Sequence, residues 1–281
     1  MSRGEAWPAP AKLNLMLRIV GRRDDGYHLL QTVFQFINIT DQLRFRPRDD
    51  GKIVRVSKIE GVPEGDDLVV RAARLLQAEA GTSAGVEVEL KKNIPMGAGL
   101  GGGSSDAATT LLALNQLWGL GLSKKRLSEL GLQLGADVPV FIHGAAAWAE
   151  GVGECLEPIS VPEMWYLVLF PACHVSTAEI FAHPQLTRDS TRITIADFFA
   201  GSRENDCLPV VTKSHVEVAE AMEWLGQFAE ARLTGTGAAV FAAFDSEEEA
   251  REVLAKLPGH MKGAVGKGLN ASPVLDMLRG S

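Results

Sequence analysis

Cysteine is scarce in this sequence of 281 residues, which contains only Cys155, Cys173 and Cys207. The three are far apart, no Cys-x-x-Cys pair occurs and no histidine stands at ligand spacing, so nothing indicates a disulfide framework or a zinc site. An apolar run of membrane-spanning length is missing, as is an apolar signal core after Met1. We therefore expect buried thiols and a cytoplasmic protein with no membrane partner.

Positive charge is also in short supply, since 28 Lys and Arg against 35 Asp and Glu leave a net charge of −7. This balance argues against nucleic acid as a partner, although a local basic groove could still hold phosphate groups. The hydrophobic content of 46% and the charged content of 22% are those of an ordinary globular protein. The length suits two domains, which we place at residues 1–157 and 158–281.

Glycine, by contrast, is concentrated in one stretch, where residues 95–108 read Pro-Met-Gly-Ala-Gly-Leu-Gly-Gly-Gly-Ser-Ser-Asp-Ala-Ala. The alternation at 86–90 predicts a strand before it, and the run 107–117 predicts a helix after it. Glycines let the backbone approach a ligand closely. A helix start adds free N–H groups and the positive end of the helix dipole. The order strand, glycine loop, helix is typical of a phosphate site.

Other interpretations of this loop are weaker. Residues 97–102 also match the spacing G-x-G-x-x-G, but the loop does not follow a first strand, and no acidic residue follows at the distance that a dinucleotide site requires. An NAD-dependent oxidoreductase is therefore only a remote alternative. A P-loop is excluded because no Gly-Lys-Ser or Gly-Lys-Thr follows. A purely structural turn would need one or two glycines.

Two groups of basic and amide residues have open roles. Residues 11–19 alternate as a strand, so Lys12 and Asn14 project from the same side. They form either a solvated edge face or a polar pair aimed into a cleft. Lys91 and Lys92 lead directly into the glycine loop. They are either ordinary surface lysines or ligands of a bound phosphate.

Three more side chains have two possible interpretations each. Tyr27 and His28 follow an Asp-Gly hairpin turn, where they could pack on the surface or stack on a base or sugar. Asp137 is a single carboxylate in the apolar stretch 134–141. It either caps a turn before Pro139 or accepts a proton from a hydroxyl nucleophile.

The rest of the chain alternates between strand and helix patterns. Residues 41–56 predict two strands around a turn at 49–51, and a helix capped by Asp66 or Asp67 follows. In the second half we expect a strand at 165–170, helices within 216–232 and 247–256, and a glycine turn at 233–237 that enters another strand. These elements indicate an α+β second domain.

Three separated motifs, at residues 10–15, 95–105 and 233–237, resemble those of the GHMP kinase superfamily. Residues 26–28, 134–141 and 149–154 further resemble the branch of that superfamily that acts on a cytidylated methylerythritol. The resemblance covers nearly the full length. It implies an α+β GHMP kinase fold with a ribosomal-protein-S5-like N-terminal domain, a ferredoxin-like C-terminal domain and an active site in the cleft between them.

The resemblance also implies a reaction. The γ-phosphoryl group of ATP would pass to the 2-hydroxyl of the small-molecule substrate 4-diphosphocytidyl-2-C-methyl-D-erythritol, with Mg²⁺ accompanying ATP. The sequence identifies no cluster of metal ligands, although Ser104 or Ser105 could offer an oxygen. A different small-molecule kinase, which should lack the cytidine contacts, and a non-catalytic binding relative, which should lack a reactive pair, are the rival interpretations.

Site residues follow from the resemblance position by position. Asp137 would be the general base and Lys12 its partner at the reacting hydroxyl. Because Lys12 favours the ionised carboxylate, we expect Asp137 to orient the hydroxyl as much as to take its proton. The residues that would hold the acceptor are Asn14 and Thr177 at the methylerythritol, His28 at the cytosine edge, and Tyr27 and Phe181 on its two faces.

The nucleotide would be bound around the glycine loop. The residues implied there are Asp67, Leu68, Lys92, Pro95, Met96, Gly97, Ala98, Gly99, Leu100, Gly101, Gly102, Gly103, Ser104 and Ser105. Leu68 and its predecessor would line the adenine pocket. Asp67 stands where relatives commonly carry asparagine, which puts an amide-mediated contact to adenine in doubt.

Overall fold

The computed structural model of the chain describes residues 5–279. Its strands are β1 (Trp7–Arg22), β2 (His28–Arg48), β3 (Ile53–Arg55), β4 (Gly85–Lys91), β5 (Ala147–Glu150), β6 (Cys155–Pro158), β7 (Trp165–Leu169), β8 (Arg232–Leu233), β9 (Val240–Phe244) and β10 (Gly263–Leu269). Its helices are the short 3-10 turn η1 (Glu64–Asp66) and α1 (Leu68–Ala80), α2 (Gly102–Leu117), α3 (Lys124–Leu134), α4 (Val138–His143), α5 (Thr177–Ala182), α6 (Ile195–Phe199), α7 (Leu208–Ser214), α8 (Val216–Gly226), α9 (Glu247–Leu254) and α10 (Val274–Arg279). Between residues 5 and 279, no helix combines the length and the apolar composition needed to cross a membrane.

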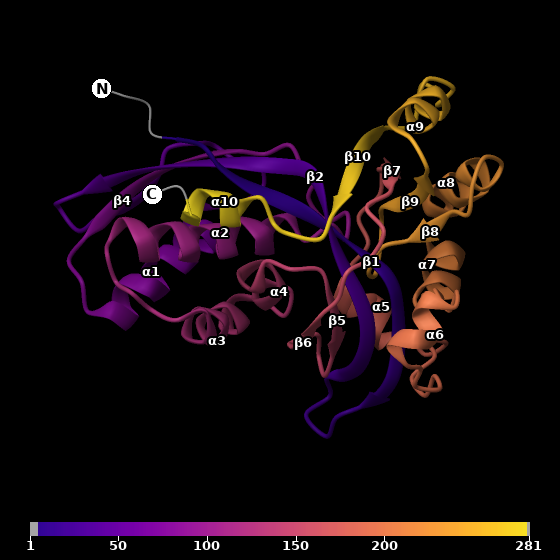
Figure 1. Cartoon of the computed structure of the whole chain (residues 1–281), viewed down its shortest axis with the longest axis horizontal. Helices are drawn as coiled ribbons and strands as arrows, with labels where there is room; N and C mark the ends of the chain where they lie inside the picture. Colours follow the sequence, from indigo (N-terminus) through magenta and orange to yellow (C-terminus); the bar gives the residue numbers. More distant parts are fainter. Residues whose placement is uncertain (1–4, 280–281) are drawn as a thin grey trace.

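A long antiparallel ribbon of β1 and β2 runs between the two halves of the molecule (Figure 1). Its register extends from Trp7 opposite Leu43 to Arg22 opposite His28, with irregularities that bend and twist it. The strand predicted at 11–19 and the hairpin after it are confirmed, and both strands are longer than the sequence pattern indicated. The ribbon therefore gives the side chains of β1 a rigid base.

The first half builds a sheet on one edge of this ribbon. β4 pairs with β2 over residues 85–91, and β5 pairs with β2 further along. The turn at 49–51 is present, but β3 pairs in parallel with β4 and not with β2. Helices α1 to α4 pack on this sheet around a first core that includes Phe36, Leu76, Leu111 and Phe141.

Two helix boundaries differ from the prediction. α2 starts at Gly102, five residues before the predicted position, because Gly101 takes the left-handed conformation (φ 70°) and ends the loop there. Glycine has a low helix propensity, but packing overrides it in this first turn. α8 ends at Gly226, since the chain must turn to enter β8 at Arg232. Asp67, one of the two expected caps, accepts a hydrogen bond from the N–H of Val69 (2.7 Å) at the start of α1.

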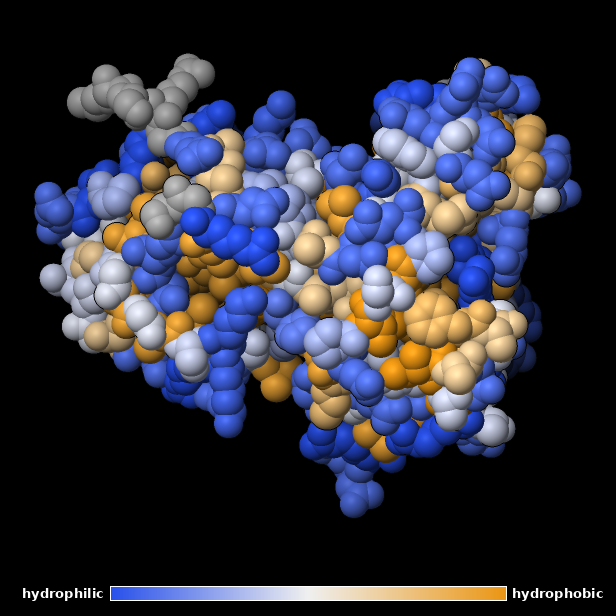
Figure 2. Space-filling model, viewed as in Figure 1, coloured by the Kyte–Doolittle hydropathy of each residue, from blue (hydrophilic) through white to orange (hydrophobic). Residues whose placement is uncertain are grey.

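Strand β10 joins the sheet of the first half to that of the second. β10 pairs with β7 at one end and with β2 at the other, where Gly268 lies opposite Ile37. The sheet order is β3-β4-β2-β10-β7-β9-β8. A second core lies under the helices of the second half, and a third lies where β1, β2, β7 and β9 meet. The face drawn in Figure 2 is mostly hydrophilic at its outer parts and is hollowed between the halves.

The end of the described chain returns to the first half. α10 packs on the first core through Val274, Leu275, Met277 and Leu278, and Figure 1 shows it beside α2. The division into residues 1–157 and 158–281 stays a prediction. α10 belongs to the second of these segments in the sequence but packs on the core of the first.

Candidate functional site

The glycine loop is held between backbone on two sides. The N–H of Lys12 on β1 donates to the carbonyl oxygen of Leu100 (2.9 Å), and the N–H of Ala239 donates to that of Ala98 (3.0 Å). Gly99 has φ +75°, and a Cβ atom there would lie 2.6 Å from the carbonyl oxygen of Gly237. Such a distance is too short for a real side chain, so the loop needs glycine at this position.

The start of α2 presents free backbone donors. With Gly101 at the N-cap, the N–H groups of Gly102, Gly103 and Ser104 have no partner within the helix. The N–H of Ser105 already donates to the carbonyl oxygen of Gly101 (2.8 Å), and its side chain is fully buried. Of the two serines expected around the nucleotide, Ser104 lines the adjoining cavities and Ser105 does not.

A first cavity of about 340 Å³ opens against this loop and helix start. Its walls include the predicted nucleotide residues other than Ser105, together with apolar side chains. Those apolar side chains are Ile59, Val62 and Leu90. The cavity thus combines a backbone anion site with apolar side chains, a combination that suits a nucleotide.

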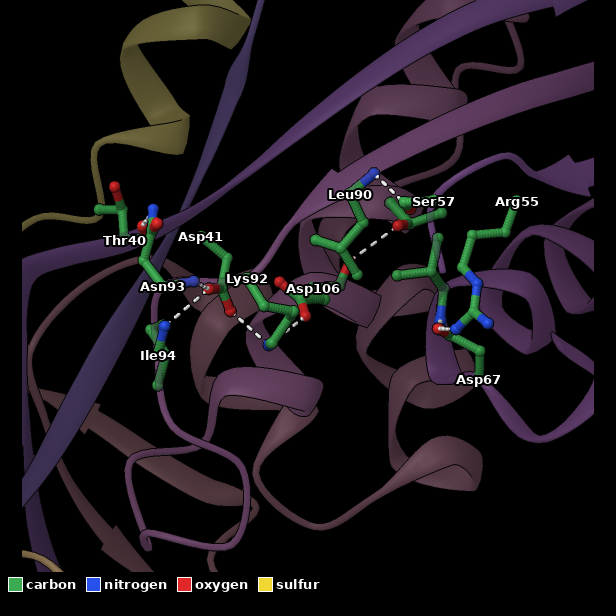
Figure 3. Close-up of polar contacts among 12 residues, drawn as sticks. Thr40, Asp41, Arg55, Ser57, Asp67, Leu90, Lys92, Asn93, Ile94 and Asp106 are labelled. Atoms are coloured by element: carbon green, nitrogen blue, oxygen red, sulfur yellow. Dashed lines mark hydrogen bonds and ion pairs between the residues drawn. The ribbon is translucent and has the colours of Figure 1, made fainter. Parts of the chain in front are cut away.

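Lys92 lies at the wall of this cavity in an ion-pair cluster (Figure 3). Its Nζ contacts Asp41 Oδ2 and lies 2.7 Å from Asp106 Oδ2. Burial alone would lower the pKa of Lys92, but the charges of Asp106 and Asp41 outweigh it and raise that pKa. The ammonium group is therefore firmly charged, and its charge is balanced within the protein.

The two carboxylates of this cluster have different surroundings. Asp41 Oδ1 accepts from the N–H groups of Asn93 (2.5 Å) and Ile94 (2.8 Å), which fixes the entrance to the glycine loop. Asp106 Oδ1 is buried and has no hydrogen-bond partner within the described residues. Burial raises the pKa of Asp106 well above its usual range even beside Lys92. The sequence reasoning identified neither carboxylate.

Asp67 is also fully engaged, as Figure 3 shows. One carboxylate oxygen caps α1, and the other contacts Nη1 of Arg55 on β3. Arg55 also donates from Nη2 to the carbonyl oxygen of Val62 (3.0 Å). Both side chains of the pair are only 6% exposed. Arg55 therefore compensates the buried charge of Asp67 and fixes residues 62–67 at the rim of the first cavity.

A second cavity of about 260 Å³ contains Lys12 and Asn14. Both residues are 3% exposed, so the interpretation as a solvated edge face is wrong. Lys12 Nζ donates to Asn14 Oδ1 (2.5 Å) and to the carbonyl oxygen of Gly99 (3.0 Å). Asn14 Nδ2 donates in turn to Thr32 Oγ1 (2.8 Å). Asn14 thus holds the ammonium group of Lys12 in a fixed position.

Asp137 faces this ammonium group across the second cavity. Its Oδ2 lies 3.4 Å from Lys12 Nζ, and its side chain is 37% exposed. Asp137 occupies the N-cap position of α4 but accepts no capping hydrogen bond, so the turn-cap interpretation is wrong. The carboxylate is left accessible to a small molecule in the cavity.

Thr177 and Phe181 extend the site from the second half. Thr177 Oγ1 lies 2.8 Å from the hydroxyl oxygen of Thr236, which stands in the second glycine turn. Both threonines line the second cavity. Thr236 was not identified from the sequence.

A third cavity of about 490 Å³ continues from the second and is lined by Tyr27, His28 and Phe181. The side chain of Tyr27 is 63% exposed. The rings of His28 and Phe181 stack on each other, with centroids 4.9 Å apart and an interplanar angle of 18°. One face of Phe181 is therefore covered by His28, an arrangement that the expected clamp of Tyr27 and Phe181 did not include. Burial lowers the pKa of His28, and the charges of Arg188 and Arg22 lower it further.

The three cavities form a series through shared walls. Gly99, Gly101 and Ser104 line both the first and the second. The walls common to the second and third are Leu30, Ala136, Val152, Thr177 and Phe181. No group of three or more His, Cys, Asp or Glu side chains suited to a metal ion occurs in residues 5–279.

The buried pair of Arg55 and Asp67 gives a stability prediction. Arg55→Met leaves the Asp67 carboxylate buried without a counter-charge, so we expect a loss of about 3 kcal/mol or more in the free energy of unfolding. Chemical denaturation measures it. Arg46→Met removes the half-exposed pair with Glu87 and should cost less than about 1 kcal/mol. Equal losses in the two variants, or no recovery when Asp67→Asn is added to Arg55→Met, would contradict this account.

Comparison with known proteins gives the family. Residues 67–145 match the GHMP kinases N terminal domain, and residues 190–263 match the GHMP kinases C terminal family. A 4-diphosphocytidyl-2-C-methyl-D-erythritol kinase from Nitrosococcus oceani is 59% identical over 272 residues, which is 97% of each chain. One from Pseudomonas aeruginosa is 56% identical over 265 residues, 94% of each chain.

Solved structures agree with these matches. A crystal structure of 4-(cytidine 5'-diphospho)-2C-methyl-D-erythritol kinase has a TM-score of 0.82 and 32% identity, covering 94% of this chain and 99% of that chain. A mevalonate kinase at 15% identity, with a TM-score of 0.67 over 95% of this chain and 100% of that one, shares the fold. The predicted α+β GHMP kinase fold is thereby confirmed. This chain belongs to the 4-diphosphocytidyl-2-C-methyl-D-erythritol kinase family of the GHMP kinases.

Proposed function

We propose that this chain transfers the γ-phosphoryl group of ATP to the 2-hydroxyl of 4-diphosphocytidyl-2-C-methyl-D-erythritol, in the non-mevalonate route to isoprenoid precursors. A kinase of this family uses ATP and a small-molecule acceptor. The observation that carries the proposal is the series of three cavities, with Lys12 and Asp137 in the middle one. A nucleotide and a base-bearing acceptor can enter from opposite ends and meet there.

The first cavity fits ATP. The free N–H groups of Gly102, Gly103 and Ser104 and the dipole of a 16-residue helix favour the phosphates. Ile59, Val62 and Leu68 offer an apolar surface to a purine base. Because both Asp67 oxygens are engaged, we assign adenine contacts to this apolar surface and to the backbone.

Lys12 and Asp137 supply the chemistry of the transfer. Asp137 accepts a hydrogen bond from the acceptor hydroxyl and takes its proton as the new O–P bond forms, while the bond between the γ-phosphorus and the β–γ bridging oxygen breaks and ADP leaves. Lys12, fixed by Asn14 and the carbonyl oxygen of Gly99, neutralises charge on the transferred group. Phosphoryl transfer needs little covalent help, so positioning and charge carry most of the acceleration.

Mg²⁺ is part of the proposal because it accompanies ATP. When bound, it neutralises phosphate charge and needs few protein ligands. The Ser104 hydroxyl fits this role, since it lies at the junction of the first two cavities. The buried Ser105 hydroxyl does not.

The proposal is tested by phosphorylation of a panel of acceptors. We expect the purified protein to consume ATP with 4-diphosphocytidyl-2-C-methyl-D-erythritol and not with mevalonate, homoserine or galactose, because the third cavity carries side chains for a base. Phosphorus NMR of the product should place the phosphate on the 2-hydroxyl. Turnover of another acceptor alone would mean that the third cavity does not bind a cytosine base. ATP binding without any turnover would support a non-catalytic relative.

Asp137→Asn should lower kcat at least about a hundredfold, because an amide can orient the hydroxyl but cannot take its proton. Steady-state kinetics measures the effect. Asp245→Asn, an exposed change outside the described cavities, should leave kcat unchanged. An Asp137→Asn enzyme within threefold of wild type would remove Asp137 from the mechanism.

Gly99→Ala should weaken ATP binding about tenfold or more, because the added Cβ collides with the carbonyl oxygen of Gly237 and displaces the phosphate loop. Calorimetric titration with ATP measures this. Gly119→Ala is the matched control, since Gly119 also has a positive φ (+64°) but no atom within 4 Å of an added Cβ. A similar loss in both variants would mean that backbone strain, and not the contact with residue 237, explains the result.

A further inference from the structure

Arg188 lies behind the third cavity and is held by backbone carbonyl groups. Its Nη2 donates to the carbonyl oxygens of Phe181 and His183, both at 2.8 Å, and its Nη1 donates to that of Leu186 (3.0 Å). Phe181 is near the end of α5 and His183 follows that helix. The guanidinium group is thus locked in one orientation, since its planar shape leaves little freedom once three such bonds are made.

The remaining bond of Arg188 reaches the base-recognition residue. Arg188 Nε donates to His28 Nε2 over 3.1 Å. Arginine can only donate, so Nε2 must be the unprotonated nitrogen of the ring. In a neutral imidazole the proton then resides on Nδ1. Among the described residues, Nδ1 makes no hydrogen bond with the protein, and His28 lines the third cavity.

Arg188 also fixes the ring of His28 against its neighbour. His28 stacks on Phe181, and Arg188 contacts both residues, the first through its ring nitrogen and the second through its carbonyl oxygen. The charge of Arg188 faces His28 together with that of Arg22, and burial and both charges lower the pKa of the ring, which disfavours a second proton. A second proton would have to be placed on Nε2, where it would point at the positively charged guanidinium group and is therefore disfavoured.

We propose that Arg188 is a positioning residue that holds His28 as an Nδ1–H donor and thereby makes the third cavity select cytosine over uracil. The N3 atom of cytosine is an acceptor and pairs with this donor, whereas N3 of uracil carries a hydrogen and opposes it. The inference deepens the proposed function and rests on it for the presence of a pyrimidine. Its first part, the position of the proton, concerns the free protein alone.

The proton position is tested by NMR of ¹⁵N-histidine-labelled protein without ligands, with His28 assigned by its loss in His28→Gln. We expect the wild-type ring to carry its proton on Nδ1, and Arg188→Met to show a mixture or the opposite tautomer. Arg188→Lys, which keeps a cationic donor, should retain more of the wild-type tautomer. A wild-type ring protonated on Nε2, or an unchanged tautomer in Arg188→Met, would overturn the proposal.

Selectivity is tested by kcat/KM for the cytidine and uridine forms of the acceptor. We expect Arg188→Met to reduce the ratio of the two about tenfold, the value of one well-placed hydrogen bond, with the KM for ATP unchanged. Arg188→Lys should reduce this ratio by a smaller factor than Arg188→Met. Arg192→Met, which removes an exposed pair with Glu150, is the matched control and should keep the wild-type ratio.

The outcomes separate this inference from the proposed function. If the tautomer changes in Arg188→Met but the ratio does not, Arg188 does not set selectivity and the proposal fails. If wild-type protein phosphorylates neither acceptor, the proposed function fails, while the NMR result still decides the role of Arg188. Should Arg188→Met not fold, Arg188→Lys decides both parts, because its ammonium group cannot keep all the bonds of the guanidinium group. A His28 tautomer and a ratio both identical to those of wild type in Arg188→Lys would overturn the proposal.

Discussion

The site depends on one packing constraint: the glycine loop must lie in backbone contact on both of its sides. β1 touches it through the N–H of Lys12, and the segment that follows the second glycine turn touches it through the N–H of Ala239. The missing side chain of Gly99 lets the second contact form. Because the turn belongs to the second half, the same contact orients the phosphate donors, the Lys12 side chain and the base-binding half relative to one another. A larger residue in the loop would disturb all three together.

The two lysines beside the loop, Lys12 and Lys92, differ in how far nearby carboxylates compensate their charge, and this difference limits the role that each can have. Lys92 faces two carboxylates, so its charge is already balanced, and its cluster fastens β2 and the residue that follows β4 to the N-terminal part of α2. Lys12 faces one partly exposed carboxylate and two neutral acceptors. Its positive charge is less fully compensated, and an incoming phosphoryl group can therefore share it. Lys12 is better placed for charge neutralisation at the reacting centre, while Lys92 shapes the wall of the nucleotide cavity.

Sequence reasoning was strongest where a function depends on neighbouring residues. The glycine loop, the shared side of Lys12 and Asn14, and the hairpin before His28 are local patterns, and the structure contains each of them. Asp41 and Arg188 were missed because their importance comes from partners distant in the chain. Arg55 was missed because its pairing with Asp67, 12 positions on, follows no local periodic pattern. Asp41 is 51 positions from Lys92, and Arg188 is 160 positions from His28.

Local patterns also misplaced some elements for a physical reason. The start of α2 runs through glycines that disfavour a helix, so only tertiary packing could reveal it. The parallel pairing of β3 with β4 depends on the path of α1, which no short pattern contains. Asp106 follows Ser105 directly, yet its raised pKa arises from burial that a sequence does not display.

The two ends of the cavity series differ in their lining: one presents backbone N–H groups and the other presents side chains. At the nucleotide end the donors are backbone N–H groups, whose directions follow from the helix start and change little with side chains. At the end where we propose that the base binds, the rotamers of His28, Phe181 and Arg188 are each fixed by a few hydrogen bonds or one stacking contact. Substitutions there can alter which base fits without changing Lys12, Asp137 or the backbone N–H groups at the start of α2. On the proposed function, phosphoryl transfer and acceptor choice are therefore physically separable, and they meet at the wall that the second and third cavities share, which includes Thr177 and Phe181.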